Sequence, residues 1–429
     1  MPGHFLLRVG PHPHALRLDS LRSLAAAAGA SLSTSSGPQT VRPIESHQMR
    51  AHLACAVALA LSACTAHRPP AQAPARASEP ALEFLGEFVV EPVPAGHRLE
   101  TARFGGISGL TLDLTTGELL GICDEGAPNR VFVFRTDLAA RPFRVDLKSY
   151  FPLPLGPGAP ERLDPEALAM TRAGRLFVAS EGFGRVEPRV PPAIVEFTRR
   201  ADYVGRLAVP SKFIPPATGP LIHGVRANEA FESLTVTPDD QRLFTGTETA
   251  LVQDGEPADA QHGTVARILE YQASGGSFEP RREFGYPVDP MPATSFTPSI
   301  FISGLVELLA LDGTELLSLE RAYAEESGGQ RRNTNRIRIF HTSLAGATDV
   351  SSFDSLRGRR GVTLARKTLV LDLADVLGLS PALPGLENFE GMGFGPPLPD
   401  GSRTILLVSD DNFSQRQRTT FLLFRLRER

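Results

Sequence analysis

The sequence is poor in cysteine, has no excess of charge of one sign, and has no apolar leader long enough to span a bilayer. Three cysteines in 429 residues are too few for a disulfide framework, so stability must come from packing. The 44 basic and 48 acidic residues nearly cancel, and a balanced chain has no global field that attracts nucleic acid or an anionic membrane. Nucleic acid is therefore not expected as a partner.

The first 80 residues are rich in Ala, Ser, Pro and His and show no sustained strand or helix pattern. Within them, Met49-Arg50 begins a short positive segment, and the apolar residues 53–61 are too few to cross a bilayer as a helix. The tetrapeptide Leu61-Ser62-Ala63-Cys64 then resembles a bacterial lipobox. By that resemblance Cys64 is the lipidation site and the mature N-terminus; a chance apolar stretch is the alternative.

Four segments are expected along the chain. They are an upstream stretch or disordered leader (1–48), a lipoprotein signal peptide (49–63), a Pro/Ala tether (64–82) and the folded domain (83–429). The protein would be exported and lipid-anchored to a bacterial membrane, facing the periplasm or the cell surface. We expect a monomer that touches the membrane through its anchor only. Cys123, within an apolar stretch, is predicted to be a buried small residue rather than a nucleophile.

One phrase recurs five times in the folded domain: an acidic or small polar residue, a small residue, Leu or Met, a polar turn, an apolar strand and a second acid. The copies are Ile107–Glu125, Pro165–Glu181, Phe231–Glu248, Gly304–Glu320 and Phe389–Asp411. A further apolar stretch follows each copy, at 130–134, 193–197, 267–271, 336–340 and 420–424. A hairpin with an added outer strand is typical of a propeller blade. The sequence therefore predicts an all-β fold, a β-propeller.

Six blades are expected, with five and seven left open. Five units are visible, and the length of the domain leaves room for another. A sixth blade could combine residues 367–371 with the N-terminal strand at 84–90, which would close the ring across the two termini.

Equivalent residues of successive blades face one another across a propeller channel, so recurring acids should converge. Converging carboxylates raise one another's pKa unless a cation neutralises them. Since His and Cys do not recur at matching positions, oxygen ligands favour Ca²⁺, with Mg²⁺ as the alternative, over zinc. The predicted metal ligands are Glu166, Glu181, Glu232, Glu248, Glu390, Asp410 and Asp411. For each acid the alternative is a loop carboxylate that caps a turn or pairs with arginine.

Four polar residues accompany the acids and are predicted to bind substrate. Asn228 and Asn388 precede recurring glutamates, and each amide could orient or share a ligand. Asn412 belongs to Asp410-Asp411-Asn412, which suits a metal loop or an Asx-rich turn. Arg321 could clamp an anionic substrate group bidentately, or it could neutralise the acids.

Taken in order, five motifs resemble the phytase-like family described as "esterase-like activity of phytase". They are Phe104–Leu110, Asp164–Ala169, Asn228–Leu234, Leu319–Arg321, and Asn388–Met392 together with Ser409–Phe413. The resemblance extends from about residue 83 to 426 and implies an exported propeller with phosphoesterase or esterase activity. It marks Glu166, Glu232 and Glu390 as the important copies. Ser108 and Glu307 would be degenerate copies that keep the fold.

Two functions follow as hypotheses. In the first, a calcium-type acidic site hydrolyses a small phosphoester or carboxylic ester, with Glu166, Glu232 and Glu390 as ligands or general base and Arg321 as the clamp. The segment Gly106-Ile107-Ser108-Gly109 lacks the spacing of a nucleophile elbow. In the second, the propeller is a non-catalytic surface module that binds a ligand or a protein, and calcium is structural. Few Lys or Arg adjoin the acids in sequence, which disfavours a hexaphosphate substrate.

Overall fold

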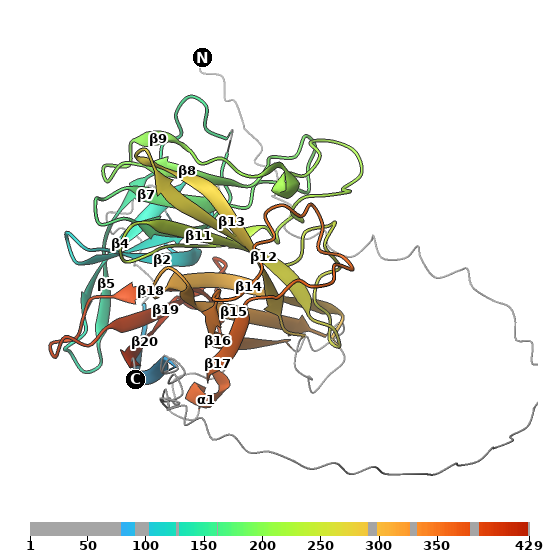
Figure 1. Ribbon diagram of the computed structural model, residues 1–429. Coiled ribbons are helices and arrows are strands. Elements are labelled where there is room, and N and C mark those ends of the chain that lie inside the picture. The colour runs from blue at the N-terminus through green and yellow to red at the C-terminus, as the bar shows by residue number, and fades with distance from the viewer. Residues whose placement is uncertain are drawn as a thin grey trace, which may run out of the picture. The chain divides into compact units, whose positions relative to one another are not determined.

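The computed structural model describes residues 79–90, 103–125, 128–160, 162–290, 298–326, 333–377 and 386–427. These residues form five antiparallel sheets of four strands each, as Figure 1 shows. The described residues also contain a short 3₁₀ helix, η1 (Ser211–Phe213), and a single helical turn, α1 (Ala374–Leu377). The prediction of an all-β propeller is confirmed.

Each sheet is one blade, numbered here from the N-terminal side. Blade 1 has β2 (Ile107–Asp113), β3 (Glu118–Cys123), β4 (Arg130–Asp137) and β5 (Arg144–Pro152). Blade 2 has β6 (Pro165–Met170), β7 (Leu176–Ser180), β8 (Ala193–Phe197) and β9 (Tyr203–Arg206). Blade 3 has β10 (Phe231–Val236), β11 (Arg242–Thr247), β12 (Thr264–Ser274) and β13 (Ser277–Val288). Blade 4 has β14 (Ile300–Ala310), β15 (Glu315–Glu325), β16 (Asn333–Ser343) and β17 (Arg366–Asp372).

Blade 5 joins the two ends of the folded domain. It contains β18 (Asn388–Gly395), β19 (Thr404–Asp410), β20 (Thr420–Arg427) and, as its outer strand, β1 (Ala81–Val89). β1 pairs with β20 from Ala81 opposite Arg427 to Val89 opposite Thr420, and Figure 1 shows the blue first strand beside the red last strand. The ring therefore closes through hydrogen bonds between the first and last strands.

The described residues form five blades, a count that the sequence left open and one fewer than the six expected. Residues 367–371 lie in β17 of blade 4 and pair with β16, whereas residues 84–90 complete blade 5. Both segments are outer strands of blades already visible in the sequence, and they do not pair with each other. Long connections account for the extra length: residues 344–365, for example, separate β16 from β17 and pack against blade 3 through Val350 N to Glu283 O at 2.8 Å.

The core consists of apolar clusters between neighbouring blades. Phe177 of blade 2 shares a cluster with Phe231 and Leu243 of blade 3, and Phe134 of blade 1 packs with Phe421 of blade 5. Similar clusters join blades 1 and 2, 3 and 4, and 4 and 5. Alternating strand residues supply these contacts because successive side chains point to opposite faces of each sheet. Each blade thus buries both of its faces against neighbours.

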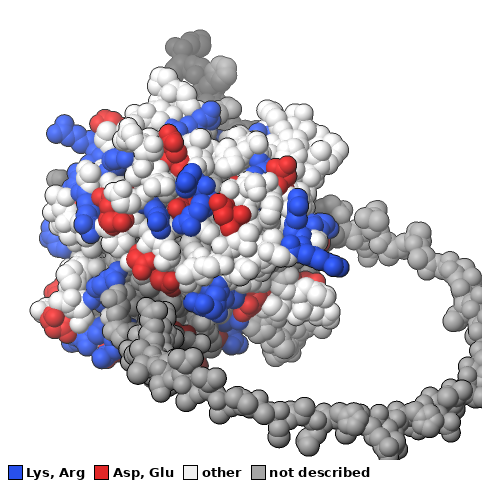
Figure 2. Space-filling model, viewed as in Figure 1, with Lys and Arg blue, Asp and Glu red and all other residues white. Residues whose placement is uncertain are grey.

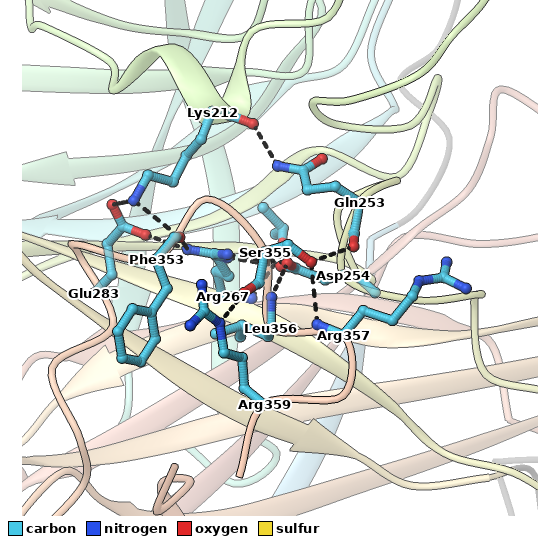
Figure 3. A network of polar contacts seen from close by, with 12 residues as sticks. Lys212, Gln253, Asp254, Arg267, Glu283, Phe353, Ser355, Leu356, Arg357 and Arg359 are labelled. Carbon is cyan, nitrogen blue, oxygen red and sulfur yellow. Dashed lines mark hydrogen bonds and ion pairs between the residues drawn. The ribbon is translucent and has the colours of Figure 1, made fainter. Parts of the chain in front are cut away.

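A buried ion network fastens the 344–365 connection to blade 3 (Figure 3). Arg267 is fully buried, and its guanidinium contacts Asp254 at 2.7 Å, Glu283 at 2.7 Å and the carbonyl of Phe353 at 3.1 Å. Lys212 of η1 also pairs with Glu283 at 3.3 Å. Because the charges of this network satisfy one another, we interpret it as a structural anchor rather than a reactive site.

The surface shows no broad patch of one sign in the view of Figure 2, where acidic and basic side chains alternate. This matches the near balance of 44 basic and 48 acidic residues. None of the helices in the described part of the chain has the length and apolarity to cross a membrane.

Candidate active site

Every innermost strand carries a β-bulge near its start, and each bulge leaves one residue unpaired. The five unpaired residues are Ser108, Glu166, Glu232, Val306 and Glu390. A bulge re-aims the side chain at its position. Three of the five are glutamates, and the charges of Glu232 and Glu390 lie close enough to Glu166 to act on one another's pKa. The bulges therefore bring three predicted site glutamates together at one end of the ring.

A second set of residues lies opposite the residue two positions before each bulge residue, on the second strand in blades 4 and 5 and directly after that strand in blades 1 to 3. These residues are Asp124, Glu181, Glu248, Arg321 and Asp410. Four of them are acids and one is an arginine. Together with the bulge glutamates they form an acidic ring whose single cation is contributed by blade 4.

The fourth copy of the repeat is displaced by one residue from its predicted alignment. Val306, not Glu307, occupies the bulge, and Arg321, not Glu320, occupies the position that corresponds to Glu248 of blade 3. Glu307 is buried and accepts the backbone N–H groups of Leu234 at 3.1 Å and Leu308 at 2.9 Å. Glu320 instead accepts the hydroxyl of Tyr286 at 2.8 Å. Both acids therefore hold blades together rather than joining the ring.

Blade 2 supplies the tightest carboxylate cluster in the described residues. One oxygen from each of Asp164, Glu166 and Glu181 lies within 4.8 Å of the other two. Glu181 also accepts the N–H of Ala230 at 2.5 Å, which holds it against blade 3. Three converging carboxylates at this spacing can ligate one hard cation.

Burial raises the pKa of these acids. It raises the pKa of Glu181 to about 7, against opposing hydrogen bonds from Glu232 and Ala230, and the pKa of Asp164 to about 6, against the opposing charges of Arg162 and Arg185. Glu166 and Glu232 are raised well above their ordinary pKa, first by burial and then by Glu181. The side chains of Glu181 and Glu232 are close enough to affect one another's pKa.

Asp124 of blade 1 shows the same effect. Its pKa is raised to about 7 by burial and then by the charges of Glu390, Asp164 and Asp411. Its buried Oδ1 has no hydrogen-bond partner in the described residues. A buried carboxylate oxygen without a donor is costly, so this atom is available to a proton or a cation.

Arg321 lies between two carboxylates of the ring. Its guanidinium contacts Glu390 at 2.6 Å and Glu248 at 3.3 Å, and it donates to the Asn388 side-chain oxygen at 2.7 Å. Burial would lower the pKa of Arg321, but the charges of Glu390 and Glu248 raise it above its ordinary value. Burial raises the pKa of Glu248 to about 8 although Arg321 opposes that shift. Of the two roles open to Arg321, these contacts display charge neutralisation; the clamp remains a prediction.

The strand end of blade 5 forms consecutive Asx turns. Asp410 Oδ1 accepts the N–H of Asn412 at 2.8 Å, and Asp411 Oδ1 accepts those of Phe413 at 3.0 Å and Gly106 at 3.0 Å. Asp411 thus links blade 5 to the start of blade 1. Burial raises the pKa of Asp410 well above its ordinary value, followed by the charges of Glu390 and Asp124. Asp410 therefore interacts with the carboxylates of the ring, whereas Asp411 accepts backbone hydrogen bonds that join blades 5 and 1.

The three predicted asparagines are placed differently. Asn388 is buried between Arg321 and Glu390, and it donates to Glu390 Oε1 at 3.0 Å. Asn228 and Asn412 are exposed, and both have a positive φ, which is 63° for Asn228 and 47° for Asn412. Asparagine tolerates this backbone region better than most residues. Asn388 orients ring residues, and the predicted substrate contact of the other two stays a prediction.

Glycine at two positions leaves room for the acids. A Cβ at Gly304 would lie 2.2 Å from Glu248 Cγ, and one at Gly106, whose φ is +63°, would lie 2.1 Å from Asp124 Oδ1. Either side chain would displace a carboxylate of the ring.

Three ring acids were not among the predicted site residues. Asp124 and Asp164 are described above, and Glu229 is partly buried with an Oε2 atom that lacks a partner in the described residues. Asp164 could have been found, because it precedes its bulge glutamate by two residues, as Asn388 does. Glu229 lies in the loop before β10, within the motif Asn228–Leu234, but it does not correspond to a recurring acid of the other copies.

The opposite end of the channel is mainly apolar, although Arg172, Asp240 and Arg403 also line it. A cavity of about 340 Å³ there is lined by inner-strand residues of all five blades, including Leu110, Leu168, Leu234, Leu309 and Met392. None of the predicted acids lines it. Cys123 is buried, as predicted, and burial raises the pKa of its thiol to about 12, so it is no nucleophile. We therefore place any chemistry at the acidic end.

The fold and site define a five-bladed β-propeller with a ring of carboxylates at one end of its channel. A family model matches residues 102–413, which is most of the chain. The protein belongs to the phytase-like family, described as "esterase-like activity of phytase". The resemblance seen in the sequence motifs is confirmed, and membership points to a hydrolase.

Solved structures with related folds are distant. They include the luciferin-regenerating enzyme (TM-score 0.34, 9% identity, 81% of this chain and 95% of that one) and a gluconolactonase from Xanthomonas campestris (0.29, 12%, 82% and 99%). A third is the N-terminal domain of Nup159, with a TM-score of 0.30, 9% identity, and coverage of 81% of this chain and 96% of that one. At these TM-scores the similarities carry no argument about function. No curated protein matches the chain.

Proposed function

We propose that this protein is an exported, calcium-dependent hydrolase of a small phosphoester or carboxylic ester. The observation that carries the proposal is the cluster of Asp164, Glu166 and Glu181, whose oxygens converge within 4.8 Å. The donor set fits a hard cation, because it consists of carboxylates and includes no His or Cys. The unpartnered Oδ1 of Asp124 fits as well, since it adds an oxygen without a donor close to these acids.

Asp164, Glu166 and Glu181 would hold the cation, with Glu232 beside them. When bound, calcium polarises the ester or phosphoryl oxygen and makes a bound water more acidic. Asp124 would not ligate the cation in this arrangement: burial raises its pKa to about 7, so its Oδ1 can take up and release a proton near neutral pH, and we assign it as the general base. Arg321 and Asn388 hold Glu390 in place through contacts of 2.6 Å and 3.0 Å.

A second candidate function is a non-catalytic propeller that binds a ligand or a protein, with a structural cation. The burial of Glu181 and Glu248, which are 5% and 2% exposed, favours it. A cation enclosed by such residues can stabilise the ring without reaching a substrate.

The test compares p-nitrophenyl phosphate, p-nitrophenyl acetate, phytate and a lactone as substrates, with calcium and with chelator. We expect calcium-dependent turnover of at least one. Absence of turnover together with unchanged thermal stability on chelation would overturn both functions of the site. A melting temperature that falls on chelation without any turnover would select the binding function.

Export and anchoring form a separate proposal that rests on Cys64, which lies outside the described residues. We expect the Cys64→Ala variant to leave the membrane fraction, because lipid attached there would be the only anchor. Cell fractionation with an antibody against the folded domain measures this, with Cys55→Ala as the matched control. Retention of Cys64→Ala in the membrane fraction would contradict the anchor.

A further inference from the structure

Two exposed arginines lie beside the carboxylate cluster of blade 2. Arg162 precedes Asp164 by two residues, and Arg185 follows Glu181 by four. Neither makes a hydrogen bond or an ion pair within the described part of the chain. Other arginines near the ring are engaged: Arg226 donates to Gly255 O at 2.6 Å, for example. Both arginines are close in sequence to acids of the cluster, and the fold leaves them exposed.

The arginines are held in place by the loop that follows β7. The Arg162 guanidinium stacks on the Phe183 ring at 3.6 Å from its centroid. Phe183 and Val190 exchange two backbone hydrogen bonds, of 2.9 and 3.0 Å, and Arg189 fastens the loop to Pro216 O at 2.9 Å. Stacking orders the guanidinium while its N–H edge stays available. Arg185 projects from the same anchored loop.

The charges of the two arginines affect the pKa of nearby acids. Arg162 and Arg185 both oppose the burial that raises the pKa of Asp164, and Arg185 does the same for Glu229. Position agrees with this: Arg162 is two residues from Asp164 and stacks on Phe183, which is two residues from Glu181. Both arginines are close to the cluster without being paired to it. A guanidinium placed beside a cation site but left unpaired presents its donors to an anion that shares that cation.

We propose that Arg162 and Arg185 bind the negatively charged oxygens of the substrate, which makes this site selective for a phosphoester over a neutral carboxylic ester. The inference rests on the proposed hydrolase and decides between its two substrate classes. In the reaction, a water oxygen bonds to phosphorus, the bond from phosphorus to the ester oxygen breaks, and a proton from the water ends on the leaving oxygen. The two arginines take no part in making or breaking these bonds; they bind the phosphoryl oxygens and position them.

The test measures KM and kcat for p-nitrophenyl phosphate and p-nitrophenyl acetate with calcium, in Arg162→Gln, Arg185→Gln and the double variant. Charge-assisted hydrogen bonds at exposed positions predict a rise in KM for the phosphoester of about tenfold per arginine. The ratio of kcat/KM for phosphoester over acetate should fall by about a hundredfold in the double variant. Arg185→Lys should recover part of the loss. A phosphoester KM within about twofold of wild type in the double variant would overturn the proposal.

The matched control is Arg200→Gln. Arg200 is exposed in the turn after β8, and Phe197 pairs with Leu176 at the opposite end of blade 2 from Glu181. This variant should keep the wild-type preference.

A further measurement separates failure of this inference from failure of the hydrolase. If no substrate turns over, calorimetry with inorganic phosphate and calcium still reports on the arginines. Binding by wild type that is weakened at least tenfold in the double variant supports the anion site. Equal binding by both proteins, or no binding by wild type, overturns it.

Discussion

Replacing both Glu166 and Glu181 by glutamine is expected to abolish calcium binding and to lower calcium-dependent turnover by about a hundredfold or more. The two side chains supply two of the three oxygens that converge within 4.8 Å. Glutamine keeps their shape but removes the charge that a hard cation requires. Calorimetry with calcium and steady-state kinetics measure the two effects.

The same variant should be more stable than wild type in chelator. Glu181 is buried and Glu166 is partly buried. Burial raises the pKa of each, so a neutral amide removes the cost of keeping charge there. This gain in stability would show that the variant loses calcium binding because a ligand is missing, and not because the protein is misfolded. Glu279→Gln, an exposed acid on β13, is the matched control and should bind calcium like wild type. An unchanged calcium affinity in the double variant would contradict the assignment.

Without calcium, the melting temperature is expected to fall by several degrees as pH rises from about 5 to 8. Folding raises the pKa of Glu181 from 4.5 to about 7, of Glu248 from 4.5 to about 8 and of Asp124 from 3.8 to about 7. Between the ordinary and the raised values, the folded state holds more protons than the unfolded state. The free energy of unfolding therefore decreases with rising pH, by about 1.4 kcal/mol per pH unit for each extra proton held.

Calcium should reverse this trend, because it binds the deprotonated carboxylates and replaces their protons. The calcium-induced rise in melting temperature should be smallest near pH 5 and largest near pH 8. Thermal melts across this range, in chelator and in calcium, measure both effects, and Glu181→Gln should flatten the chelator series. A melting temperature that rises with pH in chelator would contradict the prediction, because it would show that folding does not raise the pKa of these acids.

The blade was predictable because its signals are local. Alternating apolar residues, polar turns and recurring acids lie within each copy of the repeat, and Glu166, Glu232 and Glu390 did fall on corresponding bulges. The blade count was not predictable by the same means. Whether residues 367–371 belong to β17 or to a further blade depends on pairing with β16, which is a contact between distant segments.

The fourth copy shows where local pattern fails. Glu307 and Glu320 match the phrase by residue type, but the bulge falls at Val306 and shifts the register by one position. A shift of one residue reverses which side of the strand a side chain faces. Arg321 thereby enters the ring, and its contacts with Glu248 and Glu390 follow from that register.

The sequence by itself determined the strand units, the family and most of the acids, because these depend on residue type and short spacing. Only the tertiary structure decided the number of blades, the register that places Arg321 in the ring, and the stacking of Arg162 beside the cluster. These features depend on hydrogen-bond register and on loops packed across blades, such as the stacking of Arg162 on Phe183. Residues far apart in the chain meet there, and no local spacing encodes their distance.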